Sequence, residues 1–173
     1  MSKRKELLNH LDFDTAAQSK PYDDATGKPI RWKLVASFAP VPDAPIVELG
    51  ISENGTWVVP ATDATVWDVD ETGRYMTLFP LLLMSYFQAR NVLELEFGRH
   101  GIDPQWVSEF PFAKIAASAL KTSFGGWPDG ALEWAPSLPP SDDLRDGLTF
   151  LNKQGRTQHQ RHRAAKLLRQ LQR

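Results

Sequence analysis

Two histidines near the C-terminus have the type and the spacing of metal ligands. His159 and His162 are three residues apart in a segment without proline, so they would share one face of a helix. Two imidazoles placed in this way can hold one metal ion, but a zinc site needs at least a third protein ligand. No such ligand accompanies them, and the neighbouring arginines would repel a cation. The sequence therefore predicts no metal site.

A second group of candidate ligands is the acidic stretch Asp68-Val69-Asp70-Glu71-Thr72-Gly73. Acids at its positions 1 and 3 and glycine at position 6 match the start of a calcium loop. Such a loop also needs a bidentate acid at position 12, and that position is Phe79. Because both flanks alternate like strands, the stretch predicts a hairpin turn whose acids are solvated.

The triplet Arg99-His100-Gly101 resembles the motif of histidine phosphatases, in which the histidine takes the phosphoryl group and the arginine binds it. Those enzymes carry the triplet near the N-terminus and follow it with Glu or Gln, whereas Ile102 follows here. A turn between Gly98 and Gly101 that ends a helix explains the triplet better. A phosphatase-like enzyme using Arg99 and His100 is kept as a remote alternative.

No other enzyme signature occurs. The chain contains no Walker loop, no G-x-S-x-G, no H-E-x-x-H and no dinucleotide fingerprint. The paired acids have no convincing apolar pocket around them in the sequence. The sequence therefore assigns no catalytic residue and no cofactor, and it argues against an enzyme.

The strongest electrostatic feature is a basic end on an acidic body. From Lys153 to Arg173 there are seven Lys and Arg residues and no acid, although the whole chain has a net charge of −1. A helix over about residues 157–172 would place His159, His162, Lys166, Arg169 and Arg173 on one side, beside Arg163, and Ala164 and three leucines on the other. Such a basic face could bind a phosphate backbone, an anionic membrane or an acidic protein, and the lack of Trp or Phe on the apolar side argues against the membrane. It could also be solvated, with its leucines docked on the core.

The rest of the chain predicts one α+β domain over residues 1–173. Short alternating segments from about residue 30 to 79 predict an antiparallel meander, with a tight hairpin at Asn54-Gly55. Residues 5–19 are expected to form a short helix. Residues 80–97 are expected to form a core helix, which begins a helical layer over 80–173 that packs on one face of the sheet. The expected core contains Ile30, Trp32, Leu34 and Phe38 from the sheet, and Leu83, Phe87, Ile115 and Leu168 from the helices.

The composition indicates a cytoplasmic protein. The chain has no cysteine, which fits a reducing compartment. Its N-terminus has no apolar signal region, and no apolar run approaches the ~20 residues needed to cross a membrane. We therefore expect no membrane association.

The function expected from these observations is that of a non-catalytic protein-binding module of the inhibitor, immunity or adaptor kind. Its candidate contacts are the basic residues of the last helix and three tryptophans placed on expected loops: Trp57, Trp127 and Trp134. The alternative is a nucleic-acid-binding protein that uses the basic C-terminal helix. The oligomeric state is not predicted.

Overall fold

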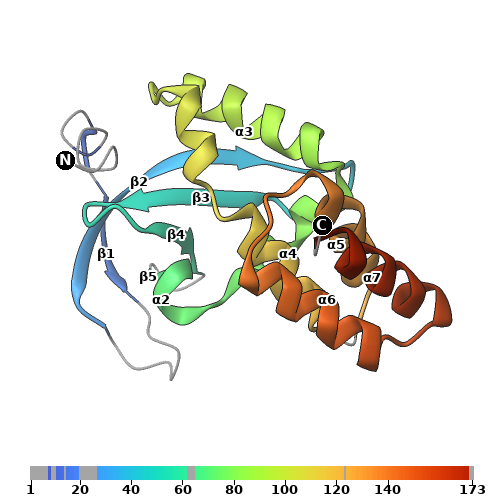
Figure 1. The fold of residues 1–173 in the computed structure, drawn as a ribbon. Coiled ribbons are helices and arrows are strands. Elements are labelled where there is room, and N and C mark those ends of the chain that lie inside the picture. Colours follow the sequence, from blue (N-terminus) through green and yellow to red (C-terminus); the bar gives the residue numbers. More distant parts are fainter. Residues whose placement is uncertain are drawn as a thin grey trace.

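The computed structural model describes residues 8, 11–13, 15–19, 27–61, 65–122 and 124–171 (Figure 1). A five-stranded sheet comes first, formed by β1 (Thr15–Ser19), β2 (Pro29–Phe38), β3 (Val47–Ser52), β4 (Trp57–Pro60) and β5 (Thr65–Asp68). Helices follow: α2 (Val69–Thr72), η1 (Tyr75–Leu83), α3 (Tyr86–Arg99), η2 (Pro104–Glu109), α4 (Phe112–Leu120), α5 (Trp127–Trp134), η3 (Ala135–Ser137), α6 (Asp142–Gln154) and α7 (Gln158–Leu171). The predicted α+β class is confirmed.

The strands follow one another as an antiparallel meander that closes on itself. Each strand pairs with the next, and β1 completes the barrel by pairing in parallel with β5. The segment 15–19 was expected to be helical but is a strand, and its backbone pairs with β2 on one side and β5 on the other. The hairpin at Asn54-Gly55 is confirmed, but only Gly55 has a positive φ, 81°. A three-residue hairpin loop requires a positive φ at only one position, which is the glycine in the left-handed region.

A bulge in β2 changes which side chains reach the core. The register between β2 and β3 shifts between Leu34 and Ala36, so Val35 and Ala36 are both fully buried. Ile30 and Trp32 lie before the bulge and pack in a small separate cluster with Val58 and Val66. Leu34 is only half-buried, while Phe38 packs against the main core. The four residues therefore do not form one core face, since an extra residue reverses the alternation.

The segment expected to be one helix over 80–97 is two elements joined at a break. Tyr75–Leu83 is a 3₁₀ helix, where residues 74–79 were expected to be a strand, and α3 begins only at Tyr86. Ser85 interrupts the chain as an N-cap: its hydroxyl accepts from the N–H of Gln88, and the Gln88 side chain accepts from the N–H of Ser85. This capping box satisfies the free N–H groups at the start of α3.

The break moves two expected core residues to the surface. Leu83 is 48% exposed and Phe87 is 65% exposed, while Leu78, Phe79, Leu81 and Leu82 are buried instead. The expected burial assumed one continuous helix, in which the position of a residue determines the face that its side chain occupies. The break at Ser85 changes which side chains face the core. Ile115 is fully buried as predicted, and Leu168 is half-buried against the core.

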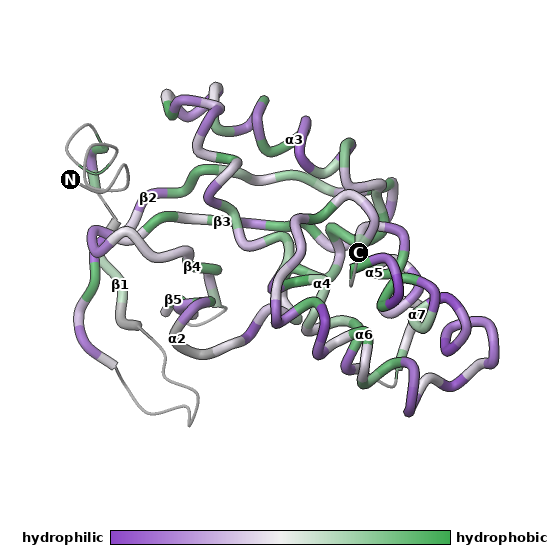
Figure 2. The backbone as a smooth tube through the Cα atoms, viewed as in Figure 1, coloured by the Kyte–Doolittle hydropathy of each residue, from purple (hydrophilic) through white to green (hydrophobic). Residues whose placement is uncertain are grey.

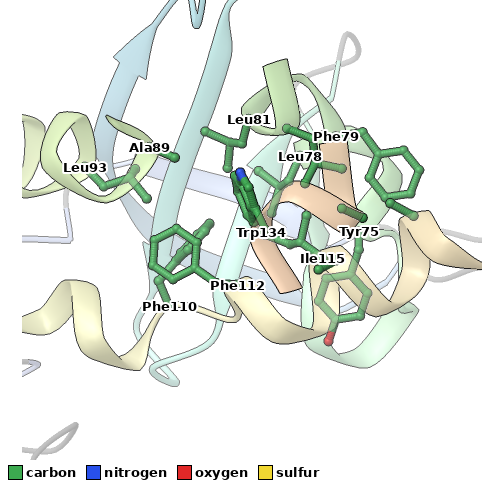
Figure 3. Close-up of a cluster of buried hydrophobic side chains, with 14 of the residues drawn as sticks. Tyr75, Leu78, Phe79, Leu81, Ala89, Leu93, Phe110, Phe112, Ile115 and Trp134 are labelled. Carbon is green, nitrogen blue, oxygen red and sulfur yellow. The ribbon is translucent and has the colours of Figure 1, made fainter. Parts of the chain in front are cut away.

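One main core joins the sheet to the helices. Trp134 of α5 is fully buried at its centre, and its Nε1 donates to the carbonyl of Met84 at 2.8 Å (Figure 3). A Cβ at Gly130 would come within 2.6 Å of the Leu82 carbonyl oxygen, so this glycine allows α5 to approach η1 closely. The last helix, α7, packs on α6 and α5, and it is the most hydrophilic part of the tube in Figure 2.

Candidate protein-binding cleft

Three polar side chains from three elements meet where the sheet joins the helices. Asp70 of α2 accepts two hydrogen bonds on the same Oδ1, one from the Tyr75 hydroxyl and one from Lys114 Nζ, each at 3.1 Å. Helix α2, directly after β5, positions Asp70, the start of η1 positions Tyr75, and α4 positions Lys114. The ion pair thus connects residues 44 positions apart in the sequence.

The surroundings keep both donors protonated. Burial, followed by the nearby charge of Asp70, raises the pKa of Tyr75 to about 12. The hydrogen bond to Asp70 raises the pKa of Lys114 above its ordinary value. A phenol and an ammonium group that keep their protons at neutral pH cannot act there as a general base or a nucleophile. The cluster is suited to binding and to holding the sheet and the helical part of the chain together.

Beside this cluster lies an open cleft of about 490 Å³. Its apolar wall is made by Tyr86, which is half-buried, and by Phe110 and Phe112, which are only 4% and 5% exposed. The rings pack edge to face, with centroids 5.2 Å apart for Tyr86 and Phe112 and 4.8 Å apart for Phe110 and Phe112. Phe112 also packs edge to face on Trp134, so the wall rests on the centre of the core. Phe110 and Phe112 are among the labelled side chains of Figure 3. Clefts of this size, with an aromatic wall and a few polar groups, are typical binding sites.

The charged residues around the cleft leave a surplus of negative charge. Its two cations have partners: Lys114 is paired with Asp70, and Arg90 Nε donates to Glu94 at 2.9 Å. Two exposed acids also line the cleft, Glu109 at the end of η2 and Asp143 in the first turn of α6. Within the described part of the chain, neither carboxylate forms an ion pair. The space beside Glu109 and Asp143 is therefore suited to a cationic group of a binding partner.

A smaller hollow of about 290 Å³ continues the cleft between α4 and α6. Lys114 and Asp143 line both spaces, and Tyr75, Ser118 and Lys121 line the second alone. The two spaces therefore form a groove that an extended segment could follow. Among the described residues, no group of three or more His, Cys, Asp or Glu side chains is arranged to hold a metal ion.

The predicted tryptophan anchors are core residues or half-buried. Trp57 is 2% exposed, stacks on Phe97 and donates from Nε1 to the Glu109 carbonyl at 3.3 Å. Trp134 is fully buried, as described above. Neither ring offers surface to a partner, because tryptophan's large apolar area is what these cores bury. Trp127 is half-buried, and its ring lies 5.8 Å from that of Phe79.

The structure places the predicted basic residues on α7, away from the residues that line the cleft. His159, His162, Lys166 and Arg169 are exposed, while Arg163 is half-buried and donates to Glu133 at 2.6 Å. Gln160 adds a second contact to the body, with Asp129 at 3.1 Å. The inner face of α7 is therefore docked, and its outer face stays in solvent. Arg173 lies outside the described residues.

The residues of the phosphatase-like triplet complete the end of α3. Arg99 pairs with Glu96, which is buried and also accepts from the N–H of Ser37 at 3.2 Å, so α3 is attached to β2. His100 is the C-cap of α3, and Gly101 has a φ of 72°. Arg99 and His100 therefore both have a structural explanation at the end of α3.

Sequence reasoning missed the cleft because its residues carry no local motif. Asp70 was assigned to a solvated turn and Tyr75 to a strand, and nothing in the sequence pairs them with Lys114. One signal was present: Lys114 is the single charged residue of α4, a helix of nine residues that is otherwise almost entirely buried. A cation in such a helix needs a partner or an exit to water.

Comparisons with known proteins add nothing to this description: no protein-family model, curated protein or solved structure matches the chain. Within the described residues, no helix is long and apolar enough to cross a membrane.

Proposed function

We propose that this chain is a non-catalytic protein-binding module of the inhibitor, immunity or adaptor kind, and that it binds its partner in the cleft beside Lys114. The observation that carries the proposal is the combination of an aromatic wall with two carboxylates, Glu109 and Asp143, that form no ion pair within the described residues. The lack of cysteine supports the expected cytoplasmic location.

The chemistry of the cleft defines the partner segment. An apolar side chain would pack mainly on Tyr86, since Phe110 and Phe112 behind it are almost fully buried, and an adjacent Lys or Arg would lie near Glu109 and Asp143. Aromatic pockets surrounded by polar residues are where binding energy concentrates in protein interfaces. We therefore expect a basic-apolar segment of another protein, with its basic residue in the cleft beside Glu109 and Asp143 and away from Lys121, which lines the smaller hollow.

The test is co-purification from the native host with a charge reversal in the cleft. The tagged full-length chain should capture a stoichiometric protein, and Glu109→Lys should reduce its recovery at least about tenfold, since like charges at an interface are strongly unfavourable. The matched control is Glu48→Lys, an exposed acid on β3 that does not line the cleft. The absence of any stoichiometric protein, or equal loss in both variants, would overturn the proposal.

A second candidate function rests on the outer face of α7. His162, Lys166 and Arg169 are exposed on one side of the helix, as duplex binding would require. An anisotropy titration against duplex DNA should then show affinity that falls steeply with salt, and it should weaken when Lys166 and Arg169 are both changed to Ala. Binding that ignores salt and both changes would exclude this mechanism.

A further inference from the structure

Helix α3 has a buried face and an outer face on which two large apolar side chains are exposed. Ala89, Leu93 and Phe97 are fully buried on its inner side, which lies over β2 (Figure 1). On its outer side Phe87 and Leu95 are each 65% exposed. Leu83, in η1 before the break at Ser85, is 48% exposed. Phe87 and Leu95 are eight residues apart on α3 with the exposed Asn91 between them, so the outer face carries two apolar side chains around a polar one.

The outer face is symmetric about one residue. Phe87 lies four residues before Asn91 and Leu95 four residues after it, so all three follow one line along the helix, and Asn91 is also exposed. If two α3 helices cross antiparallel with Asn91 at the two-fold axis, Phe87 of each copy meets Leu95 of the other. A surface that fits itself in this way is the requirement for a closed two-fold dimer.

The charges on this face are also self-complementary. Arg90 and Glu94 lie on the same flank of the line, and they form an ion pair within one copy, with Arg90 Nε 2.9 Å from the Glu94 carboxylate. In the antiparallel arrangement Arg90 of one copy comes within a turn of Glu94 of the other. Opposite charges therefore meet along that flank. A parallel arrangement would instead bring like charges together, which is unfavourable.

The backbone can approach closely at this surface. Helices pack with axes about 8–10 Å apart and carry their Cα atoms about 2.3 Å from the axis, so facing Cα atoms at the two-fold axis come to about 4–5 Å. Gly98, further along the outer side, has only Pro104 Cγ at 4.0 Å from the position of an added Cβ. No bulky side chain of α3 stands between the two copies at these two positions.

We propose that the outer face of α3 binds a second copy of this chain, in an antiparallel helix pair centred on Asn91. This surface borders the cleft, since Arg90 lines both, so the dimer brings the clefts of the two copies next to the α3 pair. A contact limited to one helix face per copy falls below the ~1,200 Å² of a standard interface, so we expect weak association at micromolar concentrations or above.

Sedimentation of the full-length chain over a concentration series measures the association. Asn91→Lys places two ammonium groups together at the two-fold axis, and it should weaken the dimer at least about tenfold. Gln154→Lys adds the same charge at an exposed site at the end of α6 and should not change the dimer. A monomer at every concentration overturns the proposal, and so does a dimer that the two substitutions affect equally.

Cysteine cross-linking tests the geometry, because the chain has no cysteine of its own. Asn91→Cys should form a disulfide-linked dimer readily, since facing Cα atoms about 4–5 Å apart lie in the range that a disulfide spans. Gln154→Cys is the matched control and should not. A mixture of Phe87→Cys and Leu95→Cys chains should give the mixed dimer in preference to either homodimer. Equal cross-linking at 91 and 154, or a preference for the homodimers, would overturn the antiparallel arrangement.

Discussion

The close contact between α5 and η1 predicts that alanine has opposite effects at two helical glycines. Replacing glycine by alanine inside a helix ordinarily stabilises it by about 1 kcal/mol. At Gly98 of α3 the added Cβ meets nothing closer than 4.0 Å. At Gly130 of α5 it would lie 2.6 Å from the Leu82 carbonyl oxygen and 3.0 Å from Leu82 Cβ. We therefore expect Gly98→Ala to stabilise the protein and Gly130→Ala to destabilise it.

The size of the Gly130→Ala effect follows from the movement that it forces. Van der Waals contact begins near 3.4 Å, so α5 must move from η1 by somewhat less than about 1 Å; overpacking of this kind costs about 1–3 kcal/mol. The same movement stretches the hydrogen bond from Trp134 Nε1 to Met84, now 2.8 Å, which loses about 1 kcal/mol more. After subtracting the helix-propensity gain, we expect a net loss of about 1–3 kcal/mol.

Urea denaturation of both variants at low protein concentration, followed by tryptophan fluorescence, measures these changes. The midpoint should rise for Gly98→Ala and fall for Gly130→Ala with similar slopes, since the same surface is exposed on unfolding. If Gly130→Ala is as stable as the original chain, or more stable, the close approach of α5 to η1 is not as described.

Three further results are expected. The pKa of Tyr75 is raised to about 12, so the stability that Tyr75 contributes is present below about pH 10 and is lost as the pH rises toward 12. In a spectrophotometric titration, one of the three tyrosines should therefore form phenolate only at high pH, and it should do so at a lower pH in Asp70→Asn. Ser85→Ala removes the capping box and should lower the free energy of unfolding by about 1 kcal/mol in urea denaturation. Trp134→Phe leaves the Met84 carbonyl without this donor and creates a cavity, so calorimetry should show a loss of about 2–4 kcal/mol.

The parts of the fold that local chemistry determines could be predicted from the sequence. The Asn54-Gly55 turn lies where the sequence indicated, because it depends on residues within one turn. The N-caps Asp103 and Ser141 depend in the same way on local residues. The short strand Thr15–Ser19 could not be predicted in this way, since one of its two partners, β5, is distant in sequence.

The break at Ser85 and the cleft could not be predicted with the same local rules. The Ser85–Gln88 capping box is a readable signal, but the apolar run on both sides favoured one continuous helix. That choice placed Leu83 and Phe87 in the core, whereas the structure exposes them. The cleft joins Asp70 to Lys114 through tertiary packing alone, and no spacing rule connects residues so far apart. The binding candidates taken from the sequence were therefore those with visible local character: the tryptophans and the basic helix.

The most direct test of the central claim is amide hydrogen exchange of the full-length chain with and without its captured protein. Binding in the cleft predicts slower exchange at the cleft wall around Phe110, Phe112 and Lys114, and at the start of α6 around Asp143, since these segments line the cleft. The loop between β2 and β3 should exchange at the same rate in both states. Protection that is confined to α7 or to that loop, with the cleft unchanged, would contradict the account.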